Sequence, residues 1–228
     1  METHLHLELE NLKVKLLKMY ALTERALDKA IRALIDRDDE LADQVLQEDK
    51  IINQIEVDIE EDILNVLARW QPVARDLRFI SGCTKIANEL ERIGDQATNV
   101  AERAVMLNRK ARLNLMNSIE DLSNVVGDMF RKSMTALSEL DCDMAREVCC
   151  LDSKADELNV TIIKSLIDYM TNESIIVERA VHTIIVVNSL ERVGDLSTNI
   201  AEYVFFIVKG INVKHSNQFD DRCSQEEE

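Results

Sequence analysis

The sequence predicts an all-α protein built as two tandem, structurally similar three-helix bundles, with six long antiparallel helices in all. Three observations predict this fold. The 228 residues include one proline and five glycines, too few turn residues for a sheet protein or a loop-rich one. Apolar residues recur every three or four positions, which is the period of an amphipathic helix. A thirteen-residue segment also occurs twice, about a hundred residues apart, which indicates two copies of one unit.

The first three helices are separated by two breaks in the apolar pattern. The first helix ends at an acidic run in which Asp38 or Asp39 is suited to cap the second helix. The second helix is expected to run to about Trp70. Pro72 suits the first position of a third helix, which is expected to end near Asn108.

A polar, basic stretch at 108–112 connects the two halves. A fourth helix follows it, a turn is expected at 141–143, and a fifth helix runs to about Met170. Capping residues stand at 171–174, and the sixth helix ends at Lys209 with a glycine after it. The expected units are a first three-helix repeat at 1–108, a second at 109–212, and a polar acidic tail at 213–228.

The charge of the chain restricts its partners. There are 43 acidic and 27 basic residues, which gives a formal charge of −16. Such a surface repels phosphate backbones and anionic membranes. The sequence therefore predicts no nucleic-acid partner and favours cations or basic protein surfaces.

Compartment follows from what the chain contains. The first residues do not form a signal peptide, and no apolar run reaches the ~18 residues of a membrane span. The five cysteines follow no C-x-x-C spacing, which favours reduced thiols over a disulfide framework or a zinc–thiolate site. A cytoplasmic protein without membrane insertion is expected.

The repeated segment is acidic. It reads LERIGDQATNVAE at 90–102 and LERVGDLSTNIAE at 190–202, with nine of thirteen positions identical. Its acids and amides fall at i, i+4, i+8 and i+11, within an arc of roughly 80° on one helix face. Carboxylates one turn apart repel each other, so a bound cation would explain why the arrangement occurs twice. The residues are Glu91, Asp95, Asn99 and Glu102 in one copy and Glu191, Asp195, Asn199 and Glu202 in the other.

The helix before each repeated segment adds further acids. In an antiparallel hairpin, Asp49 and Asp152 are expected at the height midway between the Glu and the first Asp of the segment in their own half. Asp152 is followed one turn later by Asp156, whereas Asn53 stands at the corresponding place in the first half. Each half thus presents three or four oxygen ligands, a set that suits Mg²⁺, Mn²⁺ or iron more than zinc or copper.

A plainer interpretation competes with the metal site, because a lone E-x-x-x-D pair on a helix is usually a solvated face. The duplication and the facing acids favour the metal site. So do Gly94 and Gly194, since glycine within a helix costs ~1 kcal/mol relative to alanine, and both are expected to allow close approach of a backbone or a ligand. Arg92 and Arg192 are expected to pair with acids on neighbouring turns.

Together with QPVARDLR at 71–78 and the segment 178–210, these motifs resemble the PhoU family of phosphate-transport regulatory proteins. The resemblance covers residues 5–210. It implies two PhoU-like three-helix repeats, frequent dimerisation, and metal ions held by paired E(D)-x-x-x-D motifs, as iron or zinc clusters in some members. The implied metal ligands on this chain are Asp49, Glu91, Asp95, Asp152, Asp156, Glu191 and Asp195.

The same resemblance implies an adaptor rather than an enzyme. Such an adaptor couples a phosphate ABC transporter, through its ATPase subunit, to a phosphate-sensing histidine kinase, and negatively regulates phosphate-starvation signalling. The implied assembly is a homodimer. Since Asn53 removes one charge from the first half, weaker metal loading is expected there than in the second half.

Two other functions stay open on the residues alone. One is a carboxylate-bridged metalloenzyme, such as a hydrolase or an oxidase, although no histidine or lysine base and no nucleophile is evident near the motif. The other is a metal-free helical scaffold whose acids pair with basic partners.

Overall fold

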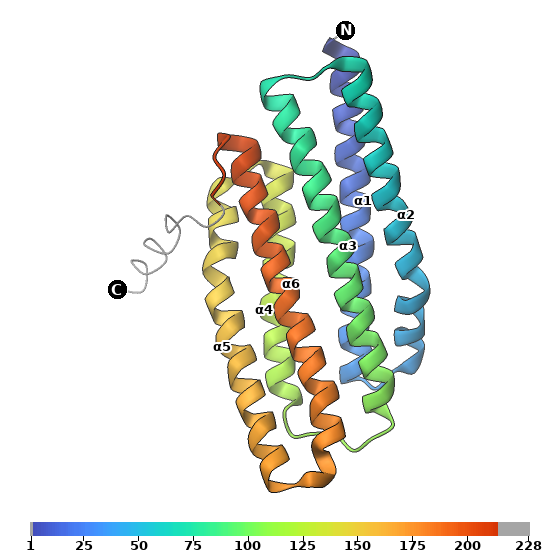
Figure 1. Ribbon diagram of the computed structural model, residues 1–228, viewed down its shortest axis with the longest axis vertical. Coiled ribbons are helices and arrows are strands. Elements are labelled where there is room, and N and C mark those ends of the chain that lie inside the picture. Colours follow the sequence, from blue (N-terminus) through green and yellow to red (C-terminus); the bar gives the residue numbers. More distant parts are fainter. Residues whose placement is uncertain (1, 214–228) are drawn as a thin grey trace, which may run out of the picture.

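Six long helices and one 3₁₀ turn make up residues 2–213, the part of the chain that the computed structural model describes (Figure 1). The predicted all-α fold of two three-helix repeats is confirmed. The elements are α1 (Glu2–Ile35), α2 (Asp39–Trp70), α3 (Ala74–Asn108), α4 (Met116–Glu139), α5 (Cys142–Asn172), η1 (Ser174–Ile176) and α6 (Val177–Lys209).

Three helix ends follow directly from local side-chain and backbone chemistry. Asp38 caps α2, since its carboxylate accepts the N–H groups of residues 40 and 41 at 3.0 and 3.1 Å. Asp141 caps α5 in the same way, at 2.8 and 3.1 Å. Gly210 ends α6 with φ 73°, a left-handed conformation that glycine adopts without steric cost.

The turn between α2 and α3 differs from the expectation. The third helix begins at Ala74 rather than Pro72. The reason is a backbone with two left-handed residues, Gln71 at φ 46° and Ala74 at φ 48°, which reverses the chain before the helix is established. The turn is therefore longer than the proline position suggested, and this moves the register between the two helices.

The turn between α5 and α6 also differs. The fifth helix extends to Asn172, two residues further than expected. The polar residues after Met170 do not cap α6, because the 3₁₀ turn intervenes and α6 begins without a side-chain cap.

The two halves lie side by side, with α3 and α6 in contact along the middle of the molecule (Figure 1). Contacts along the pair show that the two helices are antiparallel. Near one end Arg78 Nε donates to the carbonyl of Ile207 at 3.4 Å. Further along α3, Lys85 Nζ lies 5.2 Å from the centre of the Tyr203 ring. Each repeated segment therefore lies on a helix at the centre of the bundle.

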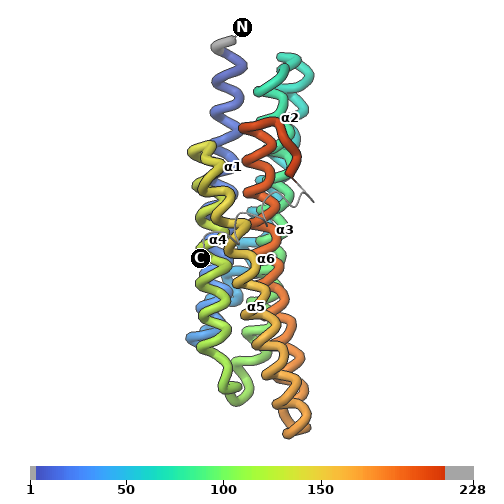
Figure 2. The backbone as a smooth tube through the Cα atoms, turned by 90° about the vertical axis from the view of Figure 1, so that its left-hand side faces the viewer, coloured from blue at the N-terminus to red at the C-terminus, as the bar shows by residue number. Residues whose placement is uncertain are grey.

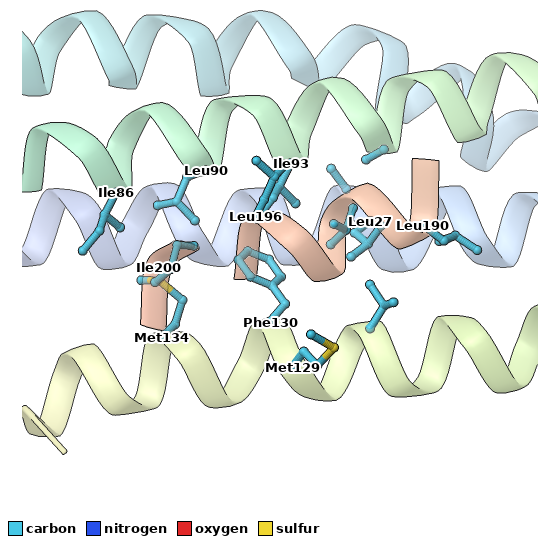
Figure 3. Close-up of a cluster of buried hydrophobic side chains, with 14 of the residues drawn as sticks. Leu27, Ile86, Leu90, Ile93, Met129, Phe130, Met134, Leu190, Leu196 and Ile200 are labelled. Atoms are coloured by element: carbon cyan, nitrogen blue, oxygen red, sulfur yellow. The ribbon is translucent and has the colours of Figure 1, made fainter. Parts of the chain in front are cut away.

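The halves share one continuous apolar core. Buried side chains of α1, α3, α4 and α6 meet in it, among them Leu27, Leu90, Phe130 and Leu196 (Figure 3). Tyr20 of α1 adds an edge-to-face contact with Phe130, with ring centres 5.1 Å apart. Viewed from the side, all the helices follow the same long axis (Figure 2). In residues 2–213 no helix is long and apolar enough to cross a membrane.

The remaining sequence expectations have mixed outcomes. Cys83, Cys142 and Cys149 carry free thiols. Cys150 is disulfide-bonded, so the expectation of reduced thiols is wrong for that residue. Val213, the first residue of the expected tail, is buried against the core, and the rest of that tail, 214–228, lies outside the described residues.

Gly82 of α3 tests the packing of α3 against α6, and Gly127 of α4 serves as the comparison. A Cβ on Gly82 would stand 2.5 Å from Ile207 Cδ1, whereas a Cβ on Gly127 would meet only Arg131, at 3.4 Å. Alanine gains up to ~1 kcal/mol of helix propensity at either site, but overpacking a core costs ~1–3 kcal/mol. We expect Gly127→Ala to raise the free energy of unfolding by about 0.5–1 kcal/mol and Gly82→Ala to lower it by about 1 kcal/mol. Urea unfolding measures both, and equal stabilisation by the two variants would contradict this packing.

Candidate metal-binding sites

The structure brings the seven sequence-predicted site residues together in two groups, one between α2 and α3 and one between α5 and α6. The first group also includes two residues of α2 that were not predicted as metal ligands, Asn53 and Glu56. We call Asp49, Asn53, Glu56, Glu91 and Asp95 the first acidic cluster, and Asp152, Asp156, Glu191 and Asp195 the second.

The register of the first hairpin differs from the expectation. Thr98 Oγ1 donates to Asp49 Oδ1 at 3.4 Å, so Asp49 faces the region of Asp95 and Thr98 rather than the midpoint between Glu91 and Asp95. The longer α2–α3 turn accounts for the shift. The space beside Glu91 is then reached by Glu56, whose Oε1 accepts from Asn88 Nδ2 at 3.5 Å.

Glu91 carries the most perturbed carboxyl of the first cluster. Burial, and to a smaller extent the neighbouring charges of Asp95, Glu56 and Asp49, together raise its pKa to about 7. Burial and the charge of Asp49 also raise the pKa of Asp95. Neither carboxylate makes a hydrogen bond or ion pair within the described residues, and the nearby charge of Arg92 only partly opposes the rise in the pKa of Glu91.

The second cluster repeats this arrangement between α5 and α6. Thr198 Oγ1 donates to Asp152 Oδ1 at 3.3 Å, as its counterpart does in the first half. Asp152 therefore also lies further along the facing helix than expected, because the 3₁₀ turn η1 lengthens the connection between α5 and α6. Burial raises the pKa of Asp152 to about 6, with the charges of Asp156 and Asp195 adding to the effect. Burial and Asp195 likewise raise the pKa of Glu191.

The arginine of the repeated segment behaves differently in the two halves. Arg192 Nη1 pairs with Asp195 Oδ2 at 2.7 Å, inside the second cluster. Arg92 Nη1 instead turns to Glu89 Oε2 at 3.0 Å, away from Asp95. The expected pairing with acids on neighbouring turns is confirmed, but only Arg192 forms an ion pair with a predicted metal ligand.

The glycines of the repeated segment do not admit a backbone or a ligand. A Cβ on Gly94 would meet the side chain of Ile52 at 3.4 Å, and one on Gly194 would meet Met129 at 3.6 Å. Both glycines therefore allow apolar side chains of a neighbouring helix to pack closely, and that part of the metal argument is wrong.

Glu56 is the residue that sequence reasoning missed. Aligning the halves at Asp49 and Asp152 pairs Asn53 with Asp156, and Glu56 with Asn159. The first half thus carries its second acid one turn later than the second half does, and each cluster contains four acids. The premise that Asn53 leaves the first half one charge short is wrong. An alignment of α2 with α5 at Asp49 and Asp152 would have shown that the second acid stands at a different position in each half.

The remaining polar residues of the repeated segment lie outside the first cluster's contacts. Asn99 Nδ2 donates to Gln96 Oε1 at 3.4 Å, and Glu102 pairs with Arg103 at 3.3 Å. In the first half the arc of four polar residues therefore contributes two members to the cluster, whereas in the second half Glu202 lies near enough to raise the pKa of Asp152.

The donor chemistry of both clusters fits a hard cation. All donors are carboxylate and amide oxygens, as Mg²⁺ and Mn²⁺ prefer. Asn53 Oδ1 is buried and accepts no hydrogen bond, although its Nδ2 donates to Asp49 at 3.0 Å. Within residues 2–213, however, no three His, Cys, Asp or Glu side chains are grouped closely enough to hold a metal ion. Coordination would therefore require the carboxylates to rotate toward one another.

The fold and the site together define a class of six-helix proteins built from two three-helix repeats, with one carboxylate cluster in each repeat. The sequence matches the PhoU domain twice, at residues 16–104 and 119–204. Each match contains three helices and one acidic cluster. The chain belongs to the PhoU family.

Known relatives support this assignment over nearly the whole length of the chain. The phosphate-specific transport system accessory protein PhoU homolog of Pseudomonas aeruginosa is 37% identical over 209 residues, which cover 91% of this chain and 86% of that protein. A crystal structure of PhoU from Pseudomonas aeruginosa has a TM-score of 0.88 and covers 90% of this chain and 99% of its own, at 37% identity. The phosphate transport system regulatory protein PhoU from Streptococcus pneumoniae has a TM-score of 0.85 at 25% identity, and the match covers 92% of this chain and 99% of that one.

The raised pKa of Glu91 predicts how stability depends on pH in the metal-free protein. Glu91 holds its proton more tightly in the folded chain, with a pKa of about 7, than its ordinary value of 4.5 allows in the unfolded chain. Raising the pH through this window therefore lowers the free energy of unfolding. We expect Glu91→Gln to weaken this loss. Urea unfolding with a chelator at pH 4.5, 6 and 7.5 measures it, and an unchanged pH dependence in the variant would contradict the raised pKa.

Proposed function

We propose that this chain is a regulatory adaptor of a phosphate-specific transport system. The observation that carries the proposal is the two-domain match along nearly the full length of relatives named as accessory and regulatory proteins of phosphate transport. A match confined to one repeat would support only the fold, whereas this one includes both acidic clusters and the seam between the halves.

The adaptor is proposed to work in the cytoplasm as a homodimer. It contacts the ATPase subunit of the phosphate ABC transporter and a phosphate-sensing histidine kinase, and it negatively regulates phosphate-starvation signalling when phosphate is plentiful. These partners follow from the family resemblance. The charge of −16 supports basic surfaces on the partner proteins as the points of contact.

Metal binding is part of the proposal. Asp49, Glu56, Glu91 and Asp95 would hold a cation in the first half, and the acids of the second cluster would hold one in the second half. A bound cation supplies positive charge that offsets the repulsion between carboxylates and joins facing helices. The oxygen donors favour Mg²⁺ or Mn²⁺, and the family resemblance points to iron or zinc.

The thiol beside the second acidic cluster does not support the metalloenzyme alternative. Cys149 is the thiol nearest to the second cluster in sequence, three residues before Asp152. Burial raises its pKa to about 12, and the charges of Glu202 and Asp152 add to the effect. A thiol this hard to ionise is a poor nucleophile, so we retain the non-catalytic role.

The adaptor role can be tested in a bacterium that lacks its own phosphate-transport accessory protein and carries a phosphate-starvation reporter. We expect the chain to restore repression of the reporter in phosphate-rich medium. The quadruple variant Glu91→Gln, Asp95→Asn, Glu191→Gln, Asp195→Asn is expected to restore at most a tenth as much, because neither cluster could then hold a cation.

The matched control removes the same kind of charge elsewhere. Glu120→Gln/Asp121→Asn changes two exposed acids on α4 and is expected to repress as the unchanged chain does. Immunoblotting establishes equal amounts of each protein. Failure of the unchanged chain to repress would contradict the adaptor role, and full repression by the quadruple variant would contradict a signalling role for the clusters.

A further inference from the structure

Arg92 and Arg192 occupy equivalent positions in the two copies of the repeated segment but form ion pairs with different partners. Each stands three residues after position 89 or 189 and three residues before the aspartate of its cluster. On a helix, both the i−3 and the i+3 residue lie within reach of an arginine. The identity of the i−3 residue therefore decides whether the guanidinium joins the cluster.

In the first half that residue is Glu89, and both of its carboxylate oxygens are engaged. Oε2 accepts from Arg92 Nη1 at 3.0 Å. Oε1 accepts from the hydroxyl of Tyr203 at 3.3 Å. Tyr203 belongs to α6, so the second half holds Glu89 across the seam. Glu89 is only 4% exposed, and a buried carboxylate is stable only when it is paired in this way.

In the second half the corresponding residue is Ser189, which has no charge to offer. Arg192 accordingly pairs with Asp195 at 2.7 Å. The second cluster therefore already contains a tethered cation, and an incoming metal ion must displace it or accept one fewer carboxylate. In the first cluster Arg92 lies near enough to lower the pKa of Glu91, but its ion pair is with Glu89, so within the described residues the carboxylate of Asp95 has no paired guanidinium.

We propose that Glu89, held by Tyr203 of the other half, is a positioning residue that keeps Arg92 from pairing with Asp95 and so makes the first acidic cluster the stronger of two cation sites. The inference rests on the proposed metal binding. It reverses the ranking that the sequence suggested, since Glu56 restores the charge that Asn53 removes while Arg192 lowers the charge of the second cluster.

The seam allows the reciprocal change to be made in the other half. Tyr203 lies opposite Lys85 and Glu89, and Ile207 lies opposite Arg78. Continuing this antiparallel register places Arg103 of α3 at the height of Ser189. A glutamate introduced at position 189 would therefore lie near two arginines, Arg103 and Arg192. Their positive charges would offset the cost of burying its carboxylate.

The test uses Mn²⁺ and two chains in which one cluster has been disabled. Glu191→Gln/Asp195→Asn leaves the first site, and Glu91→Gln/Asp95→Asn leaves the second. Titration calorimetry gives the Mn²⁺ affinity of each chain, and circular dichroism verifies that each one is folded. We expect the first site to bind about two- to fivefold more tightly, the ratio that an exposed ion pair of this kind supports.

Exchanging the residue at the i−3 position should exchange the affinities. Glu89→Ser, added to the chain that keeps the first site, is expected to lower its Mn²⁺ affinity about two- to fivefold. Ser189→Glu, added to the other chain, is expected to raise its affinity by a similar factor. Tyr203→Phe is a milder variant that removes one hydroxyl and should act in the same direction as Glu89→Ser, while Glu89→Asp retains the charge and should restore most of the affinity.

A structural readout separates the positioning role from a general loss of stability. In a crystal structure of the full-length Glu89→Ser protein, the Arg92 guanidinium is expected within 4 Å of the Asp95 carboxylate, the limit that defines an ion pair. The proposal is overturned if Arg92 stays away from Asp95 in that variant, or if Glu89→Ser leaves the Mn²⁺ affinity of the first site unchanged. Absence of Mn²⁺ binding in both single-site chains would instead overturn the metal function itself, and the ranking with it.

Discussion

Along the middle of the molecule α3 and α6 pack against each other in opposite directions, and every other long helix rests on one of the two (Figure 1). The small residues Gly82, Ala97 and Ala101 of α3 are fully buried, and the apolar core continues across the seam. Because each central helix gives one face to the other, a different face is left for the helix that precedes it. The acidic residues lie on that second face, so the packing that joins the halves also sets the orientation of both clusters.

Electrostatics makes these clusters unlike ordinary solvated helix faces. Partial burial withdraws solvent from carboxylates that already repel one another, and the pKa of Glu91 rises to about 7 as a result. Near neutral pH a proton therefore competes with any cation for this site, and cation binding would release protons. The two halves meet the same problem with different residues. In the first half the second acid of α2 stands at position 56 rather than at position 53. In the second half Arg192 forms an ion pair with Asp195.

The sequence predicted the helices and the facing acids well, because an apolar period of 3.6 residues determines which side of a helix is buried. It did not predict heights along a hairpin, since these depend on the turn. Gln71 and Ala74 adopt left-handed conformations that are more common for glycine and asparagine, so nothing in their identity indicated a longer turn. Because of this change in register, Glu56 lies beside Glu91, which the sequence did not predict. Glu89 was missed for a related reason, because its role depends on Tyr203 of a helix that lies more than a hundred positions away in the sequence.

We propose that the acidic clusters between α2 and α3 and between α5 and α6 are cation sites. The most direct measurement is a crystal structure of the Mn²⁺-soaked protein with anomalous data collected at the manganese edge. We expect one anomalous peak between Glu91, Asp95 and the facing acids of α2, and a weaker one beside Asp195, each within about 2.0–2.6 Å of carboxylate oxygens. Peaks elsewhere on the acidic surface, with none at the two clusters, would contradict it.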